Sequence, residues 1–219
     1  MRTAKTVLTV IQERGKQKKP IERVYKLLFN RELYLNAYAK LYPNNGAMTK
    51  GVTDETVDGM SIQKIDRMIE ILREEKYQWK PARREYIKKK NGKKRPLGIP
   101  VWGDKVLQEV MRQILEAYYE PQFSEHSHGF RPNRGCHTAL QEIQVWKGTR
   151  WFIEGDISQY FDTIDHKILL EILARNIHDG RFIRLVSNML EAGYLEEWKF
   201  NQTISGVPQG GVISPILAN

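Results

Sequence analysis

Apolar residues recur every three or four positions in several stretches of the chain, which is the pattern of helices with one buried face. Ser61, Asp104 and Asp165 each stand just before such a stretch, where a side-chain oxygen can cap the first turn. The predicted helices lie within 24–41, as one long or two short helices, and at 62–72, 106–118, about 137–146, 166–173 and about 181–191.

Three other stretches predict strands. The dipeptide Asn91-Gly92, within residues 82–99, predicts a hairpin with a two-residue turn, because both residues tolerate positive φ. Residues 151–157 (WFIEGDI) predict a buried strand, and residues 198–206 (WKFNQTISG) predict a second hairpin. Ser214 and the proline after it predict a helix start with Ser214 as N-cap. Hairpins and helices are segregated along the chain, so the predicted fold class is α+β.

The chain is basic, with a net charge of +9 over 219 residues and a sequence pI of about 9.5. Part of the surplus is clustered, since eight consecutive positions contain Lys88, Lys89, Lys90, Lys93, Lys94 and Arg95. A cluster of this kind attracts polyanions, whereas a scattered surplus only aids solubility. Charge therefore predicts nucleic acid as the partner, with a plain solvated loop as the alternative.

Composition also excludes several classes of protein. The single cysteine, Cys136, excludes an intramolecular disulfide and a multi-cysteine zinc site. No stretch approaches 18 consecutive apolar residues, and the N-terminus lacks the apolar core of a signal peptide. We expect a soluble, cytoplasmic protein of a bacterium, with an organelle as the alternative. Residues 1–19, rich in Lys, Arg and Gln, are expected to be mobile until they meet a partner.

Asp156 ends the predicted strand 151–157, where alternation places it on the same side as Phe152 and Glu154. A carboxylate there must be solvated, paired or metal-bound, because burying an unpaired charge is costly. Residue types alone favour a solvated strand end. His126 and His128 offer a rival metal site, but their spacing fits no usual zinc pattern, so we expect them to form hydrogen bonds within their loop.

Four segments resemble, in order, the fingers and palm motifs of reverse transcriptases: KKRPLGIPVWGDKVLQEVMRQIL, FSEHSHGFRPNRGCHTAL, GDISQYFDTIDHKIL and GVPQGGVISPILAN. The sequences RPLGIP and HGFRP, together with the loop GAMTKGVTDETVDGMS, are similar to those of the group II intron-encoded reverse transcriptase and maturase family. The resemblance covers about residues 20–219 and implies part of a right-hand polymerase. Its divisions would be a basic segment (1–19), an N-terminal extension (20–80), fingers (81–149) and a partial palm (150–219).

The resemblance also implies roles for single residues. Asp156, assisted by the backbone carbonyl of Ile157, matches a ligand of the two Mg²⁺ ions used in phosphoryl transfer. Phe161 matches the aromatic residue that packs under the sugar and excludes a 2′-OH, with a plain core position as the alternative. The incoming deoxynucleoside triphosphate would be held by Lys89, Arg95 and Gln209. Backbone contacts or solvation are implied for Lys90, Lys93 and Lys94. Arg131 either reaches a template phosphate or forms a salt bridge that fixes its own loop.

One departure from the family limits this interpretation. The family places two further metal-binding carboxylates in a Tyr-x-Asp-Asp hairpin, and none of the eight aspartates of this sequence stands in an Asp-Asp pair. The few residues after Ser214 favour a chain truncated before that hairpin over a short terminal turn. We therefore expect this chain alone to be inactive as a polymerase.

Three functional hypotheses follow. The first is the fingers and partial palm of an RNA-directed DNA polymerase that binds RNA template, DNA primer and its own intron RNA, which it helps to splice. The second is a non-catalytic intron-RNA-binding module. The third is a reverse transcriptase of another bacterial lineage, such as a retron. Self-association into a homo-oligomer is a further expectation, because palm surface would be left uncovered.

Overall fold

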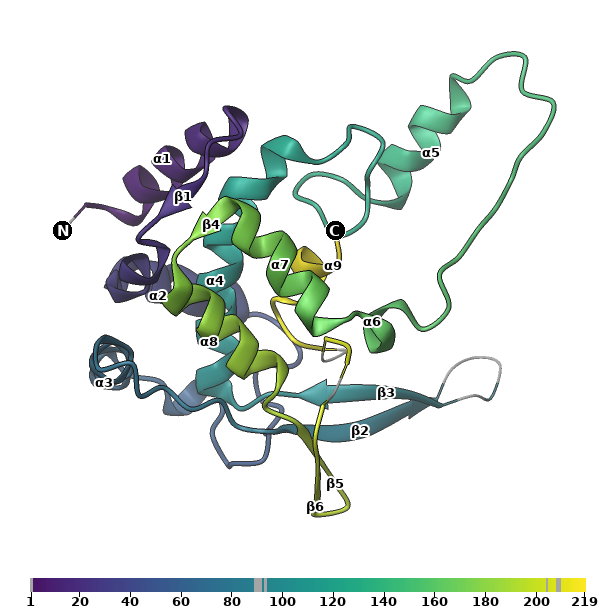
Figure 1. Cartoon of the computed structure of the whole chain (residues 1–219). Helices are drawn as coiled ribbons and strands as arrows, with labels where there is room; N and C mark the ends of the chain where they lie inside the picture. The colour runs from purple at the N-terminus through teal and green to yellow at the C-terminus, as the bar shows by residue number, and fades with distance from the viewer. Residues whose placement is uncertain (1, 89–91, 93, 204, 208–209) are drawn as a thin grey trace.

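The central element is the helix α4 (Trp102–Tyr119), which other helices surround (Figure 1). The computed structural model describes residues 2–88, 92, 94–203, 205–207 and 210–219. The apolar positions that predicted this helix are all buried, namely Val106, Leu107, Val110, Met111, Ile114, Leu115 and Tyr118. All four predicted divisions of the chain contribute side chains to one buried hydrophobic cluster. Where fingers and palm divide stays a prediction.

Asp104 does not cap α4, contrary to the sequence-based prediction. The N-cap is Val101, and Asp104 lies within the first turn as a buried residue. Its carboxylate accepts hydrogen bonds from the Tyr77 hydroxyl (2.7 Å) and the Lys80 backbone N–H (3.0 Å). Burial raises the pKa of Asp104 to about 6, although both hydrogen bonds act in the opposite direction. Asp104 therefore ties the segment after α3 to the core helix.

The expectation of a mobile N-terminal segment was wrong. Residues Ala4–Lys16 form the helix α1, whose first turn is capped by the Thr3 side chain. Ala4, Ile11 and Gly15 lie on the buried face of α1, which packs against α4. A Cβ at Gly15 would collide with the Tyr118 carbonyl, so this contact requires glycine. A few small or apolar residues at helical spacing are sufficient to dock a segment that composition marks as polar.

The next elements follow the predicted pattern. Residues 24–41 form two short helices, the 3-10 helix η1 (Val24–Phe29) and the α-helix α2 (Arg31–Leu41). The 42–60 loop contains only one short 3-10 turn, η2 (Val57–Gly59). Ser61 caps the helix α3 (Ile62–Arg73) by accepting a hydrogen bond from the Lys64 N–H (3.2 Å), as predicted.

The larger sheet has the strand order β3-β2-β5-β6. Its strands are β2 (Ala82–Lys88), β3 (Lys94–Ile99), β5 (Tyr194–Glu196) and β6 (Lys199–Asn201). The first hairpin is confirmed, with Lys88 of β2 paired with Lys94 of β3. The predicted turn falls largely on residues outside those described. Asn91 lies outside the described residues. The second hairpin begins earlier than predicted and turns at Glu197 and Trp198, which have φ values of 49° and 66°.

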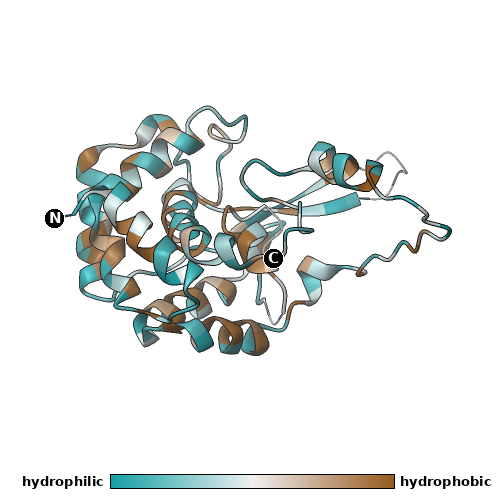
Figure 2. Cartoon of the chain, turned by 90° about the horizontal axis from the view of Figure 1, so that it is seen from above, coloured by the Kyte–Doolittle hydropathy of each residue, from teal (hydrophilic) through white to brown (hydrophobic). Residues whose placement is uncertain are grey.

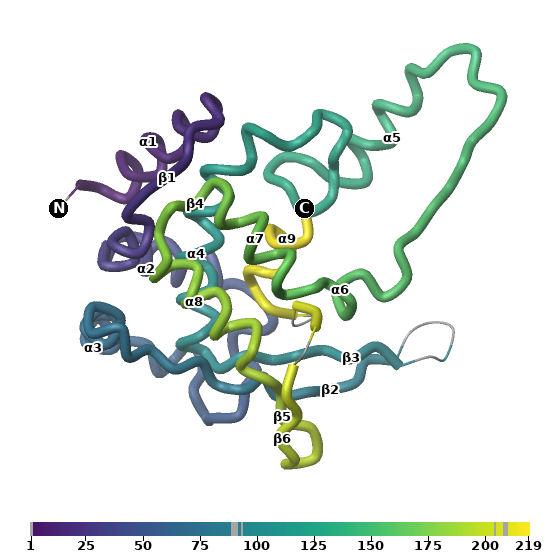
Figure 3. The backbone as a smooth tube through the Cα atoms, in the orientation of Figure 1, coloured from purple at the N-terminus to yellow at the C-terminus, as the bar shows by residue number. Residues whose placement is uncertain are grey.

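The predicted buried strand 151–157 is not formed. Residues 145–159 instead make a long arc between the helices α5 (Cys136–Gln144) and α6 (Tyr160–Thr163), as Figures 1 and 3 show. Figure 2 shows this arc, seen from above, reaching away from the packed helices. Trp151 is 86% exposed and Ile153 is 93% exposed. No strand within the described part of the chain pairs with this segment, so its backbone stays solvated in spite of its apolar side chains.

The remaining described elements are the helices α7, α8 and α9, a short strand pair and a 3-10 turn. Asp165 caps the helix α7 (His166–Asn176) through a 3.0 Å hydrogen bond from Ile168 N–H, and the helix α8 (Gly180–Leu190) follows as predicted. Between them, β4 (Ile177–His178) pairs in parallel with β1 (Ile21–Glu22). The last helix, α9, spans Ser214–Ala218, with Ile213 at the N-cap one residue before the expected Ser214. A 3-10 turn, η3 (Glu120–Gln122), extends the end of α4.

Candidate nucleotide and nucleic-acid site

A cavity of about 380 Å³ lies where the larger sheet meets the segments around α6 and residues 205–207. Its polar lining includes Arg84 of β2 and Asp162 of α6. Pro96 and Gly98 of β3, with Gly206 and Val207, complete the part of the wall that belongs to the predicted motifs. Three motif segments that are far apart in the sequence therefore share one cavity.

Backbone hydrogen bonds fasten the 205–207 turn to the segment that contains Phe161. The Val207 N–H donates to the Phe161 carbonyl (2.8 Å), and the Gly206 N–H donates to the Ile164 carbonyl (2.8 Å). Gly206 has a φ of +87°, and a Cβ there would lie 2.7 Å from the Phe161 carbonyl oxygen. The His166 ring contributes a further hydrogen bond through Nε2 and the Gly206 carbonyl (2.7 Å). The glycine is required both by its backbone angle and by this close approach.

The segment after this turn is attached to β3 and to α4. Gly210 has a φ of +106°, and a Cβ there would lie 2.7 Å from the Gly98 carbonyl oxygen on β3. The Val212 N–H donates to Oε1 of the buried Gln108 side chain of α4 (2.9 Å). Contacts with sheet, helix and the Phe161 segment therefore hold residues 205–207 and 210–212 in place. Gln209, which the family resemblance singled out, lies outside the described residues.

Phe161 is half-buried and packs against the hydrophobic core. Its ring meets the Tyr160 ring edge-on, with 5.8 Å between the centroids. The Tyr160 hydroxyl in turn donates to the Ala218 carbonyl in α9 (2.8 Å). Phe161 is adjacent to Asp162 of the cavity wall, so its position suits both a core residue and a residue that packs under the sugar. Its contact with a sugar stays a prediction.

Asp156 and Ile157 are exposed on the 145–159 arc, and no described contact brings them to the cavity. Mg²⁺ in proteins prefers six oxygen ligands, usually with one or two carboxylates and bound phosphates or water. Within the described residues, no group of three or more His, Cys, Asp or Glu side chains lies close enough together to hold a metal ion. The residues described do not form the expected metal site.

The predicted basic cluster is only partly described. Lys89, Lys90 and Lys93 lie outside the described residues, whereas Lys94 and Arg95 begin β3 and are exposed. Sequence reasoning did not predict Arg84, whose guanidinium carbon lies 3.3 Å from the centroid of the Tyr194 ring beside the cavity. The position of Arg84 in the hairpin could have indicated it, because Arg84 pairs with Gly98. Gly98 has no side chain to fill the space beside Arg84.

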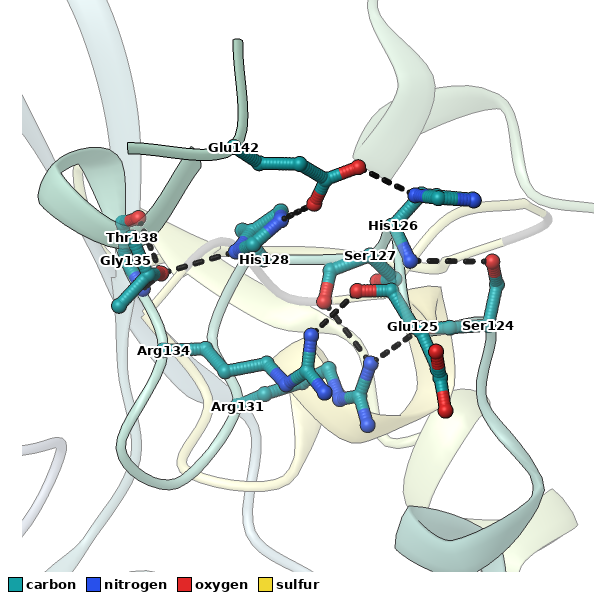
Figure 4. A network of polar contacts seen from close by, with 10 residues as sticks. All are labelled: Ser124, Glu125, His126, Ser127, His128, Arg131, Arg134, Gly135, Thr138 and Glu142. Carbon is teal, nitrogen blue, oxygen red and sulfur yellow. Dashed lines mark hydrogen bonds and ion pairs between the residues drawn. The ribbon is translucent and has the colours of Figure 1, made fainter. Parts of the chain in front are cut away.

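Arg131 fixes its own loop, and the proposed reach toward a template phosphate is not supported. Its guanidinium donates to the Glu120 carboxylate (2.9–3.1 Å). It also donates to the carbonyls of Ser124 (2.6 Å) and Ser127 (2.8 Å) (Figure 4). The Arg131 side chain is only 4% exposed. A buried guanidinium whose donors are already engaged is a structural brace.

His126 and His128 form hydrogen bonds, as predicted, but their ring partners lie on helix α5 and not within the loop. Both rings contact the Glu142 carboxylate of α5, and Nδ1 of His128 also contacts the Thr138 hydroxyl (2.8 Å) (Figure 4). These hydrogen bonds, first from His128 and then from His126, lower the pKa of Glu142. The histidines therefore tie the loop to α5.

Comparison with known proteins identifies the family. The profile of the family described as reverse transcriptase (RNA-dependent DNA polymerase) matches residues 87–219, which is more than half of the chain. The group II intron-encoded protein LtrA of Lactococcus lactis subsp. cremoris is 51% identical over 199 residues, covering 90% of this chain and 33% of that protein. A 91 kDa uncharacterized protein in the cob intron of Schizosaccharomyces pombe is 47% identical over 224 residues, covering 99% of this chain and 28% of that protein.

The chain therefore belongs to the reverse transcriptase family. Within that family, the relatives reported above are proteins of introns: the group II intron-encoded protein LtrA and the protein in the cob intron. The fold agrees, because a chain of a partial Cas6-RT-Cas1–Cas2 complex has a TM-score of 0.58 over 89% of this chain and 33% of that chain, at 19% identity. The chain spans about a third of the length of LtrA. Among the described residues, no helix is long and apolar enough to cross a membrane.

Proposed function

We propose that this chain forms the fingers and part of the palm of an RNA-directed DNA polymerase encoded by a group II intron, which also binds its intron RNA to assist splicing. One observation carries the proposal. The Phe161–Asp162 segment, the 205–207 turn and the β2-β3 hairpin surround a single cavity, as a nucleotide site built from these motifs requires. RNA template, DNA primer and deoxynucleoside triphosphates are the proposed partners. The proposed location is the cytoplasm of a bacterium.

The proposed roles of individual residues follow from the family resemblance. Arg95 grips the triphosphate, Lys94 contacts the nucleic-acid backbone, and Phe161 limits the space at the sugar. Asp156 and the Ile157 carbonyl bind Mg²⁺ only together with carboxylates that this sequence does not contain. Since this sequence contains no Asp-Asp pair, the 219-residue chain alone is proposed to be inactive.

Primer extension tests the proposal directly. A longer protein containing this chain should extend a DNA primer on an RNA template, and Asp156→Asn should abolish extension while RNA binding is retained. Glu154→Gln is a matched control, because it removes a neighbouring exposed carboxylate that has no proposed role. Extension by Asp156→Asn at the unsubstituted rate would remove Asp156 from the metal site. Extension by the 219-residue chain alone would refute its proposed inactivity.

A non-catalytic RNA-binding role is the second candidate, and the exposed cations of β3 in a chain of net charge +9 favour it. If about four phosphates are neutralised, RNA affinity should fall on the order of 100-fold between about 50 and 200 mM salt. Filter binding of the cognate intron RNA and of an unrelated duplex RNA measures both the salt dependence and the selectivity. Equal affinity for the two RNAs would leave only general polyanion binding.

A further inference from the structure

His166 is the first residue of the helix α7, and its half-buried ring contacts the turn that forms part of the wall of the candidate nucleotide site. Its Nε2 atom lies 2.7 Å from the carbonyl oxygen of Gly206, 40 residues further along the chain. A carbonyl oxygen can only accept a hydrogen bond, so Nε2 carries the proton and donates it. Gly206 is among the described residues that line the cavity and His166 is not, so His166 acts on the site through Gly206.

Both polar backbone groups of Gly206 are engaged by residues 164–166. The Gly206 N–H donates to the Ile164 carbonyl (2.8 Å), and the Gly206 carbonyl accepts from His166. Gly206 is buried, so water does not readily replace a lost partner. A buried carbonyl without a partner is unfavourable, so without the His166 donor the turn should shift until this oxygen reaches water.

The helix that carries His166 is a firm support for this contact. Leu169 and Leu173 of α7 belong to the buried hydrophobic cluster, and α7 packs against α8. Gly206 and Val207 are both buried and both line the cavity, so a shift of the turn changes the shape of the site. A wall that is already in place before the ligand arrives lowers the free-energy cost of binding.

We propose that His166 is a positioning residue for the incoming deoxynucleoside triphosphate, because it holds the 205–207 turn in the place where the nucleotide binds. The alternative is a role within its own helix. The first turn of α7 is already capped by Asp165, which accepts from the Ile168 N–H (3.0 Å), and the His166 hydrogen bond leaves the helix. The proposal rests on the proposed function in taking a nucleotide as the ligand of this cavity.

Two variants of equal length separate the hydrogen bond from the bulk of the ring. Gln has an amide donor near the position of Nε2, whereas ionised Glu can only accept. Glu is favourable in the first turn of a helix, so His166→Glu should leave α7 intact.

Primer extension by the longer protein measures the effect on the nucleotide. His166→Glu should raise the KM for deoxynucleoside triphosphates about tenfold and change kcat less than about threefold, because the lost interaction serves binding. His166→Gln should keep KM within about twofold of the unsubstituted value. The matched control is Lys167→Glu, which adds an acidic side chain at the next, exposed position of α7 and should also leave KM unchanged.

Amide hydrogen exchange of the 219-residue chain tests the positioning without any activity. His166→Glu should speed exchange at Val207 at least about fivefold, whereas His166→Gln and Lys167→Glu should not. If His166→Glu fails to fold, His166→Asn replaces it, because its neutral side chain is too short to reach the Gly206 carbonyl.

Three results would overturn the proposal: unchanged exchange at Val207 in His166→Glu, an unchanged KM in the same variant, or an equal rise of KM in His166→Gln. A longer protein that extends no primer in any form would refute the proposed function instead. The exchange at Val207 would then still decide whether His166 positions the turn.

Discussion

Gly206 offers the most direct test of how the candidate site is held together. Gly206→Ala adds a Cβ at a residue whose φ is +87°, where it would lie 2.7 Å from the Phe161 carbonyl oxygen and 2.9 Å from both Cα and the carbonyl oxygen of Asp162. The left-handed backbone alone costs an L-residue about 1–2 kcal/mol. Relief of the collision requires the turn to move away from the backbone of Phe161 and Asp162.

That movement weakens two backbone hydrogen bonds of 2.8 Å, from Gly206 N–H to Ile164 and from Val207 N–H to Phe161. Each contributes about 1 kcal/mol, so Gly206→Ala should lower the free energy of unfolding by about 2–4 kcal/mol in total. Urea denaturation measures the change, and amide hydrogen exchange at Gly206 and Val207 shows whether the loss is local. In the longer protein, primer extension should fall as well.

Gly155→Ala is the matched control, because a Cβ at Gly155 meets no atom within 4 Å and its φ is not in the left-handed region. It should change the free energy of unfolding by no more than about 0.5 kcal/mol. Equal stability of Gly206→Ala and the unsubstituted chain, with unchanged exchange at Val207, would refute the assignment of this turn as the fastener of the site.

Three further predictions concern titration and ion pairing. Because burial raises the pKa of Asp104 from 3.8 to about 6, the folded chain binds this proton more tightly than the unfolded chain. The free energy of unfolding should therefore fall by up to about 3 kcal/mol as pH rises from about 4 to 6 and then level off. Urea denaturation of Asp104→Asn over the same pH range should show no such decrease. Arg131→Ala leaves Glu120 without its buried partner and should lower the free energy of unfolding, measured by urea denaturation, by about 2–4 kcal/mol. Arg134→Ala in the same loop should lower it far less. Equal losses in the two variants would contradict the role of Arg131 as a structural brace. Hydrogen bonds from the His128 and His126 rings lower the pKa of Glu142. The contact between Glu142 and these rings should therefore persist through the usual pH range of carboxyl titration and be lost only at lower pH. Amide NMR shifts of Glu142→Gln at neutral pH should resemble those of the unsubstituted chain at acidic pH.

Local signals in the sequence were reliable where the structure depends on near neighbours. Ser61 and Asp165 cap their helices because an N-cap acts on an amide three residues away. The core face of α4 follows from its own spacing of apolar residues. Asp104 failed as a cap because its partners, Tyr77 and Lys80, are more than twenty residues distant and compete for its carboxylate.

Signals that depend on distant partners were less informative. Residues 151–157 have the composition of a strand, yet a strand forms only when another strand supplies its hydrogen bonds. Helix α1 shows the opposite error, since its three buried positions have meaning only in the presence of α4. The family resemblance identified the segments around the cavity, but only the structure showed that Gly206 and Gly210 fasten them through backbone contacts. Arg84 had no motif to mark it.

The pairing of β1 with β4 has a consequence for how the chain folds during synthesis. Ile21 pairs with Ile177, and the Tyr25 N–H donates to Asp179, 154 residues further along the chain. At about 5–20 residues per second, a ribosome needs roughly 8–30 s to make the intervening segment. During that interval Val24 and Leu28, which are fully buried in the folded chain, lack the helix α8 that packs against η1. The packing of β1 and η1 is therefore completed late in synthesis. Nascent chains that stop before Ile177 should be substrates for chaperones and proteases.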